Sequence, residues 1–124
     1  TFFAGRDDVT RFFLGADLLL HPAVMESGGI VLLEAAIAGL PVLATSVCGF
    51  APYLRDARAG VLIDEPFRQA ALNEALAAAL ADPEARGRWS RNGLDYGARA
   101  DIYDMPGRVV DVIEEQIGER AVSA

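Results

Sequence analysis

The sequence contains no lysine. Its 11 basic side chains are all arginines, and 18 acidic residues outnumber them to give a net charge of −7. A surface of this sign repels nucleic-acid phosphates and anionic lipid headgroups, so we expect no nucleic-acid partner. The missing lysine also excludes P-loop nucleotide hydrolases, protein kinases and phosphorylation-type receiver domains, because each needs a lysine at its active site.

Cysteine and histidine are almost as scarce, with one of each, Cys48 and His21. No internal disulfide can form, which agrees with a reducing compartment. These two residues cannot build a metal site, and no Asp-x-Asp pair follows a predicted strand, so we expect neither a metal nor a cofactor. The sequence has no apolar run of the ~18 residues that span a bilayer and no basic-then-apolar leader, which predicts a cytoplasmic protein.

Hydrophobic residues make up 52% of the 124 residues, enough for one globular domain with a real core. Short apolar segments predict strands at residues 1–4, 17–20, 41–45 and 61–63. Helical spacing and end signals predict helices at residues 7–16, 29–38, 67–81, 84–100 and 106–117, with a helical turn within 50–57. The alternation predicts the α/β fold class, a doubly wound parallel sheet covered by helices on both faces.

Ligands of such sheets bind beside the carboxyl ends of the strands, which points to the loop from His21 to Gly29. Within this loop, Ser27-Gly28-Gly29 stands immediately before a predicted helix. Glycines there let a ligand approach the backbone, and the N–H groups and positive dipole of the helix start face it. A plain tight turn is an equally good interpretation of these glycines alone.

Glu34 is the only charged residue between Ile30 and Ala38, in a helix without a polar face. We expect this helix to be buried, and a buried carboxylate needs a partner. The partner is either an arginine or backbone group of the domain or a ligand hydroxyl. Glu26 precedes the helix, whose N-terminus favours anions. The Glu26 carboxylate therefore lies before the N-terminus, and the Glu34 carboxylate lies about 7 Å beyond it along the helix axis. This spacing suits a nucleotide-sugar, which has hydroxyls at both ends and a diphosphate in the middle.

Glu26 and Glu34 are separated by seven residues, and Ala35, Gly39 and Leu40-Pro41-Val42 follow. This phrase resembles the Glu-x(7)-Glu signature of the family-4 retaining glycosyltransferases, which have the GT-B fold. The resemblance covers nearly the whole chain and identifies residues 1–124 as a C-terminal donor-nucleotide-binding domain. That domain is Rossmann-like and incomplete, because its first strands are missing.

Three further stretches are similar to those family members that transfer glucose from UDP-glucose to an inner-core heptose of bacterial lipopolysaccharide. These stretches are Gly5-Arg6-Asp7-Asp8-Val9, Val47-Cys48-Gly49 and Tyr103-Asp104-Met105-Pro106. The resemblance therefore implies UDP-glucose as the donor and the lipopolysaccharide core as the acceptor.

The resemblance also implies roles for individual residues. Glu34 holds the ribose hydroxyls, and Glu26, the expected catalytic residue, contacts the hexose hydroxyls. The other expected substrate-binding residues lie beside the hexose or the diphosphate: Ser27, Gly28, Gly29, Ile30 and Val31. The implied chemistry is front-face substitution with retention, without a covalent enzyme intermediate and without a metal.

The cations that neutralise the diphosphate in this family, and its acceptor-binding domain, have no counterpart in the sequence. We therefore expect the chain to be part of a longer enzyme and to be inactive alone. The acceptor would bind through the missing N-terminal domain, which could also hold the enzyme at the inner membrane.

Other functions stay open at this point. One alternative is a non-catalytic GT-B relative that binds a nucleotide-sugar, or nothing, as a scaffold. The presence of both Glu26 and Glu34 argues against a loss of the catalytic function. A dinucleotide-dependent oxidoreductase is disfavoured because no Gly-x-Gly-x-x-Gly follows a predicted strand. His21 could act as a general base, but a histidine that closes a strand before proline is more often held by a backbone hydrogen bond, or it helps to shape the sugar pocket.

The missing strands also predict how the isolated chain behaves. In the usual strand order of a doubly wound sheet, 3-2-1-4-5-6, residues 1–4 would be strand 3 and residues 17–20 strand 4. Without strands 1 and 2, strand 4 has a bare edge that recruits other strands. We expect the isolated chain either to pair residues 1–4 with residues 17–20 or to form a homodimer edge to edge.

Overall fold

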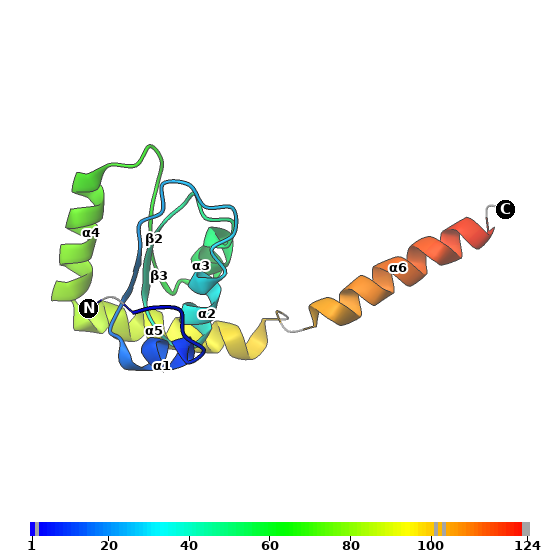
Figure 1. The fold of residues 1–124 in the computed structure, drawn as a ribbon, viewed down its shortest axis with the longest axis horizontal. Coiled ribbons are helices and arrows are strands. Elements are labelled where there is room, and N and C mark those ends of the chain that lie inside the picture. Colours follow the sequence, from blue (N-terminus) through cyan, green and yellow to red (C-terminus); the bar gives the residue numbers. More distant parts are fainter. Residues whose placement is uncertain (2, 101, 103, 123–124) are drawn as a thin grey trace.

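The computed structural model describes residues 1, 3–100, 102 and 104–122, and Figure 1 shows their arrangement. A small sheet stands at the centre with helices packed around it, and one long helix, α6, extends away from the rest. The elements follow one another in the order α1 (Val9–Gly15), β1 (Leu19–His21), α2 (Val31–Ile37), β2 (Val42–Thr45), α3 (Ala51–Ala57), β3 (Gly60–Ile63), α4 (Gln69–Ala81), α5 (Pro83–Arg99) and α6 (Met105–Val122). Each predicted helix is confirmed, with ends that differ by a few residues.

The three strands run parallel in the order β1-β2-β3. Leu19 of β1 pairs with Val42 of β2, and Val42 pairs in turn with Gly60 of β3. The carboxyl ends of the strands therefore meet at one edge of the sheet, where His21 and Thr45 are the last residues of β1 and β2. The strands predicted at residues 17–20, 41–45 and 61–63 are confirmed.

The central strand β2 is buried along its whole length, and its side chains alternate between two hydrophobic clusters. Val42 and Ala44 belong to the larger cluster, together with residues of α2 and α3 such as Leu32. Leu43 belongs to the other cluster, together with Leu72 of α4. Helices thus cover both faces of the sheet, which confirms the doubly wound α/β class.

The prediction of an opening strand at residues 1–4 is wrong for the residues described there. Residues 1, 3 and 4 lie outside any strand, and β1 pairs only with β2 in the described sheet. Phe3 instead contacts Phe12 of α1 edge to face, with ring centroids 5.0 Å apart, and the Arg6 guanidinium lies over both rings. The described residues of this segment therefore pack through ring contacts with α1 and not through strand pairing. Pairing of residues 1–4 with the strand at 17–20 is therefore wrong too, while the homodimer stays a prediction.

Helix α6 projects from the body of the molecule (Figure 1). It carries several large apolar side chains that are exposed. These side chains are Val109, Val110, Val112, Ile113 and Ile117. Within the described residues, no helix is both long and apolar enough to cross a membrane. Helix α6 therefore adds little to the hydrophobic core around the sheet.

Helix α5 packs tightly on α2 because it carries a glycine where the two helices cross. Gly93 is buried, and a Cβ atom at this position would overlap the carbonyl oxygen of Ala36 on α2. One turn later, a Cβ atom at Gly97 would lie 2.9 Å from the Ile37 Cβ. The backbones of α5 and α2 are therefore in close contact, which holds α2 against the sheet.

The start of α2 depends on a left-handed residue. Gly29 has a φ of 79°, and a Cβ atom there would lie 3.2 Å from the Cys48 Cβ and 3.3 Å from the Glu26 Cγ. At Gly28 a Cβ atom would meet nothing within 4 Å. Of these two adjacent glycines, Gly29 is required by the backbone conformation and Gly28 is not.

The contact between α2 and α5 predicts the effect of a single methyl group. Gly93→Ala should lower the stability of the full protein by about 1 to 3 kcal/mol, the usual cost of overpacking, although alanine is the better helix former. Gly87→Ala on the same helix is the control, because its Cβ would meet only the end of the Arg91 side chain at 3.6 Å. The control should preserve or slightly raise stability. Thermal and denaturant unfolding measure both variants, and equal effects would contradict the close packing.

The turn before α2 yields a second matched pair. Gly29→Ala should destabilise the protein by about 1 to 2 kcal/mol, because a residue with a side chain is strained at this φ. Gly28→Ala should change the melting temperature by less than the error of the measurement. A Gly28 variant as unstable as the Gly29 variant would show that the turn differs from the one described.

Candidate functional site

Two loops meet at the carboxyl edge of the sheet, one after β1 and one after β2. The Phe50 N–H of the second loop donates to the Gly28 carbonyl of the first, with 3.0 Å between nitrogen and oxygen. Gly49 leaves so little room that a Cβ atom there would overlap the carbonyl oxygen of Ser27. The loop backbones are therefore in direct contact, which fixes the chain just ahead of α2.

Thr45, the last residue of β2, holds the other end of the first loop. Its hydroxyl donates to the Ala23 carbonyl over 2.6 Å, and the side chain is buried. Between the anchors at Ala23 and Gly28, Val24 and Met25 are 74% and 93% exposed. The loop is thus fixed at two points and open to solvent between them.

Glu26 lies between these two anchors. Its Oε1 accepts the Gly28 N–H over 3.1 Å, and its side chain is 33% exposed. The other carboxylate oxygen, Oε2, lies 4.0 Å from Nε2 of His21 at the end of β1. The structure therefore brings Glu26, Gly28 and His21 together at the edge where sheets of this class bind ligands.

Cys48 packs beside Gly29 and is buried. Burial raises the pKa of its thiol, a hydrogen bond with Thr45 opposes this rise, and the negative charge of Glu26 adds to it. A thiol with a raised pKa stays protonated at neutral pH and is a poor nucleophile. In the part of the chain that the structure describes, no group of three His, Cys, Asp or Glu side chains could hold a metal ion.

Glu34 is exposed, so the prediction that it is buried within an apolar helix is wrong. Helix α2 buries Leu32, Ala35 and Ala36, whereas the face that carries Glu34 opens toward α1. No described residue donates a hydrogen bond to the Glu34 carboxylate or forms an ion pair with it. The sequence left two possible partners for Glu34, a group of the domain itself or a ligand hydroxyl. In the described part of the domain, no arginine or backbone group is that partner.

Glu34 lines a cavity of about 350 Å³ between α1 and α2. Asp7 and Thr10 supply the other polar groups of its wall, and the remaining lining residues are Val9, Phe13, Ile37 and Ala38. Sequence reasoning missed this cavity and the position of Thr10. The likeness of residues 5–9 to the family is the signal that could have indicated this cavity. Asp7 and Val9 of this stretch line the cavity together with Glu34.

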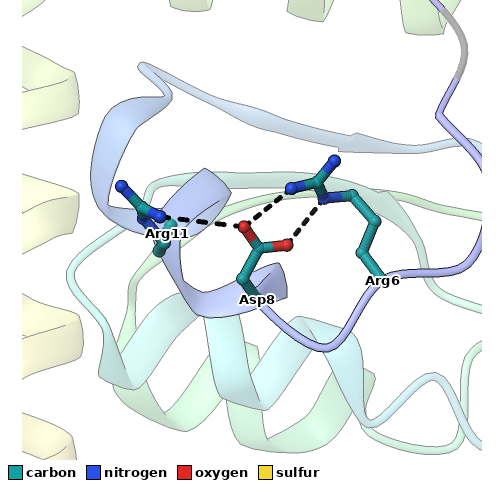
Figure 2. A network of polar contacts seen from close by, with 3 residues as sticks. All are labelled: Arg6, Asp8 and Arg11. Atoms are coloured by element: carbon teal, nitrogen blue, oxygen red, sulfur yellow. Dashed lines mark hydrogen bonds and ion pairs between the residues drawn. The ribbon is translucent and has the colours of Figure 1, made fainter.

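Asp8 precedes α1 and interacts with two arginines, as Figure 2 shows. Arg6 donates from Nε to Oδ1 over 2.6 Å and from Nη2 to Oδ2 over 2.8 Å, and Arg11 Nη1 lies 4.0 Å from Oδ2. The hydrogen bonds from Arg6 hold the pKa of the Asp8 carboxyl below its usual value. Asp8 is the N-cap residue of α1 but makes no cap hydrogen bond with its side chain, and its carboxylate is paired with Arg6 instead. This exposed pairing joins the residues on either side of Asp7, which lines the cavity.

The start of α2 presents free backbone donors. Among the described residues, the N–H groups of Gly29, Ile30 and Val31 donate no hydrogen bond, as expected for a first helical turn. The Gly28 N–H is different, because Glu26 already accepts from it. The Ile30 side chain is 55% exposed and lines a second cavity of about 450 Å³, which has an aromatic wall of Phe50, Tyr53 and Tyr96.

Comparison with known proteins gives the family. Residues 1–95 match the family described as "Glycosyl transferases group 1". Over 112 residues the chain is 51% identical to the lipopolysaccharide glucosyltransferase WaaG of Escherichia coli K12, a match that covers 90% of the chain and 30% of WaaG. It is 32% identical over 116 residues to a D-inositol 3-phosphate glycosyltransferase of Thermobispora bispora, covering 92% of the chain and 26% of that protein. The chain thus spans less than a third of these relatives.

Solved structures agree with this assignment. The crystal structure of WaaG superposes with a TM-score of 0.85 at 50% identity, covering 91% of the chain and 30% of WaaG. Sucrose-phosphate synthase of Thermosynechococcus elongatus superposes with a TM-score of 0.70 at 23% identity over 88% of the chain and 27% of the synthase, which is evidence for the fold alone. Both neighbours are GT-B glycosyltransferases, so the GT-B likeness expected from the sequence is confirmed. The chain belongs to the group 1 family of glycosyl transferases.

Proposed function

We propose that the chain is the donor-nucleotide-binding domain of a retaining glycosyltransferase that transfers glucose from UDP-glucose to the inner core of lipopolysaccharide. One observation carries the proposal: Glu26 and Glu34 flank the start of α2, and the N–H groups of Gly29, Ile30 and Val31 between them lack partners in the described structure. The identity of 51% with WaaG supports glucose and lipopolysaccharide as substrates.

The nucleoside end of the donor binds in the cavity between α1 and α2. The Glu34 carboxylate there has no partner among the described residues, so two ribose hydroxyls can donate to it in charge-assisted hydrogen bonds. The cavity volume of about 350 Å³ lies within the usual range for small-molecule sites, and Asp7 and Thr10 add polar groups to its wall.

The hexose end binds at the loop after β1. The Gly28 N–H holds one oxygen of Glu26, which leaves Oε2 to accept hexose hydroxyls. The diphosphate lies between the two ends, beside Ser27 and the unpaired N–H groups of α2. This arrangement binds the donor without a metal and orients the anomeric carbon for attack from the front face.

The rest of the enzyme supplies what these residues lack. A net charge of −7 repels a diphosphate, so cations from another domain must neutralise it. We assign acceptor binding and contact with the inner membrane to that domain also, in an otherwise cytoplasmic enzyme. The isolated chain is then inactive, binds UDP only at about millimolar concentrations, and can pair as a homodimer through the free edge of β1.

Substitution of Glu34 tests the nucleoside site. In the full protein, Glu34→Gln should weaken UDP binding by about 1.5 to 3 kcal/mol, because both ribose hydroxyls lose a charged acceptor. Since Glu34 is exposed, the melting temperature should stay unchanged. Calorimetric titration measures the affinity, and Glu74→Gln on α4, also exposed and outside the cavity wall, is the control. Unchanged UDP affinity would rule out the assigned ribose contact.

Substitution of Glu26 tests the hexose site. Glu26→Ala should lower kcat with UDP-glucose at least about tenfold while UDP affinity stays within about twofold, because the carboxylate contacts the sugar and not the nucleotide. Product formation on a core oligosaccharide that ends in heptose gives kcat, and calorimetry gives the UDP affinity. Equal losses of both quantities would contradict this division between Glu26 and Glu34.

A further inference from the structure

His21 has an unusual environment at the end of β1. Its Nε2 is fully buried and has no hydrogen-bond partner, and it is the one such side-chain nitrogen or oxygen among the described residues. Buried polar atoms in native proteins almost always have a partner, so an unpaired nitrogen needs an explanation.

The nearest charged group is the carboxylate of Glu26. Its Oε2 lies 4.0 Å from Nε2, about 1 Å beyond the length of a charge-assisted hydrogen bond. The other oxygen, Oε1, is already held by the Gly28 N–H. One oxygen of Glu26 is therefore fixed by the backbone, while the other faces the unpaired nitrogen.

The loop can close this gap without moving its ends. It is anchored where Thr45 binds the Ala23 carbonyl and where Phe50 binds the Gly28 carbonyl. Between the anchors Val24 and Met25 are exposed and the Glu26 side chain is partly exposed, so this part of the loop has few packing contacts that oppose a small shift.

We propose that His21 is a positioning residue for Glu26, and this inference rests on the role proposed above for Glu26 in hexose binding. When the donor sugar occupies the site, the loop moves inward and the His21 Nε2–H donates to Glu26 Oε2. The carboxylate is then held by Gly28 on one oxygen and by His21 on the other, each oxygen keeping a lone pair for a sugar hydroxyl. His21 does not exchange a proton with the substrate, because Nε2 is buried and faces the carboxylate.

The experiment compares four variants of the full protein with UDP-glucose and a heptose-terminated core oligosaccharide. His21→Leu removes the donor, His21→Gln places an amide N–H at a reach similar to Nε2, and His21→Asn carries an amide too short to reach Glu26. The fourth variant is the double substitution His21→Leu with Glu26→Ala, which is compared with the single Glu26→Ala variant described above. We expect His21→Leu and His21→Asn to lower kcat about tenfold. His21→Gln should keep at least about a third of the original kcat. UDP affinity should stay within about twofold in all variants.

The double variant separates action through Glu26 from other effects. If His21 acts by positioning Glu26, His21→Leu should change kcat less than about twofold once Glu26 is alanine. Additive losses would overturn the proposal, as would a normal kcat in His21→Leu or His21→Asn, or equal impairment of the Asn and Gln variants. A normal kcat in Glu26→Ala would overturn both this proposal and the role of Glu26, whereas an impaired Glu26→Ala beside a normal His21→Leu would overturn only this one.

Discussion

The contact between the loops after β1 and β2 determines the geometry of the site. Gly49 has no side chain and therefore lets the Ser27 carbonyl approach, and the Phe50 N–H binds the Gly28 carbonyl at that point. Parallel pairing of β1 with β2 brings the two loops to the same edge, and Gly29 then takes the left-handed conformation that starts α2. The orientation of α2 and the position of Glu26 both depend on this contact.

The two glutamates occupy different environments, which suits different tasks. Glu26 is partly buried, and the Gly28 N–H holds it. Glu34 is exposed and has no partner among the described residues, so its carboxylate is hydrated until a ligand replaces the water. An exposed carboxylate costs little free energy to maintain, and under the proposed function it accepts charge-assisted hydrogen bonds from ribose hydroxyls without breaking an internal ion pair.

The parts of this structure that follow from periodicity could be predicted from the sequence. The apolar segment at residues 41–45 predicts a strand buried on both faces, and β2 is buried throughout. The motif from Glu26 to Glu34 indicates the loop and helix of the site, and the family match agrees with it. These features depend on local sequence and on the regular geometry of parallel sheets.

Other features depend on tertiary contacts that a sequence pattern does not contain. The apolar surroundings of Glu34 in the sequence suggested burial, but α1 leaves one face of α2 open. The segment at residues 1–4 has the composition of a strand, yet Phe3 packs on Phe12 of α1, and the described residues of this segment pair with no strand. The unpaired nitrogen of His21 could not be foreseen either, since it depends on a distance to Glu26 that only the folded loop defines.

The central claim is that one donor molecule spans the start of α2, from the α1–α2 cavity to the loop after β1. The most direct test is a crystal structure of the full protein with a non-transferable analogue of UDP-glucose. The account predicts ribose hydroxyls within hydrogen-bond distance of the Glu34 carboxylate and hexose hydroxyls within the same distance of Glu26. A nucleotide bound elsewhere, such as in the aromatic cavity beside Tyr53 and Tyr96, would contradict it.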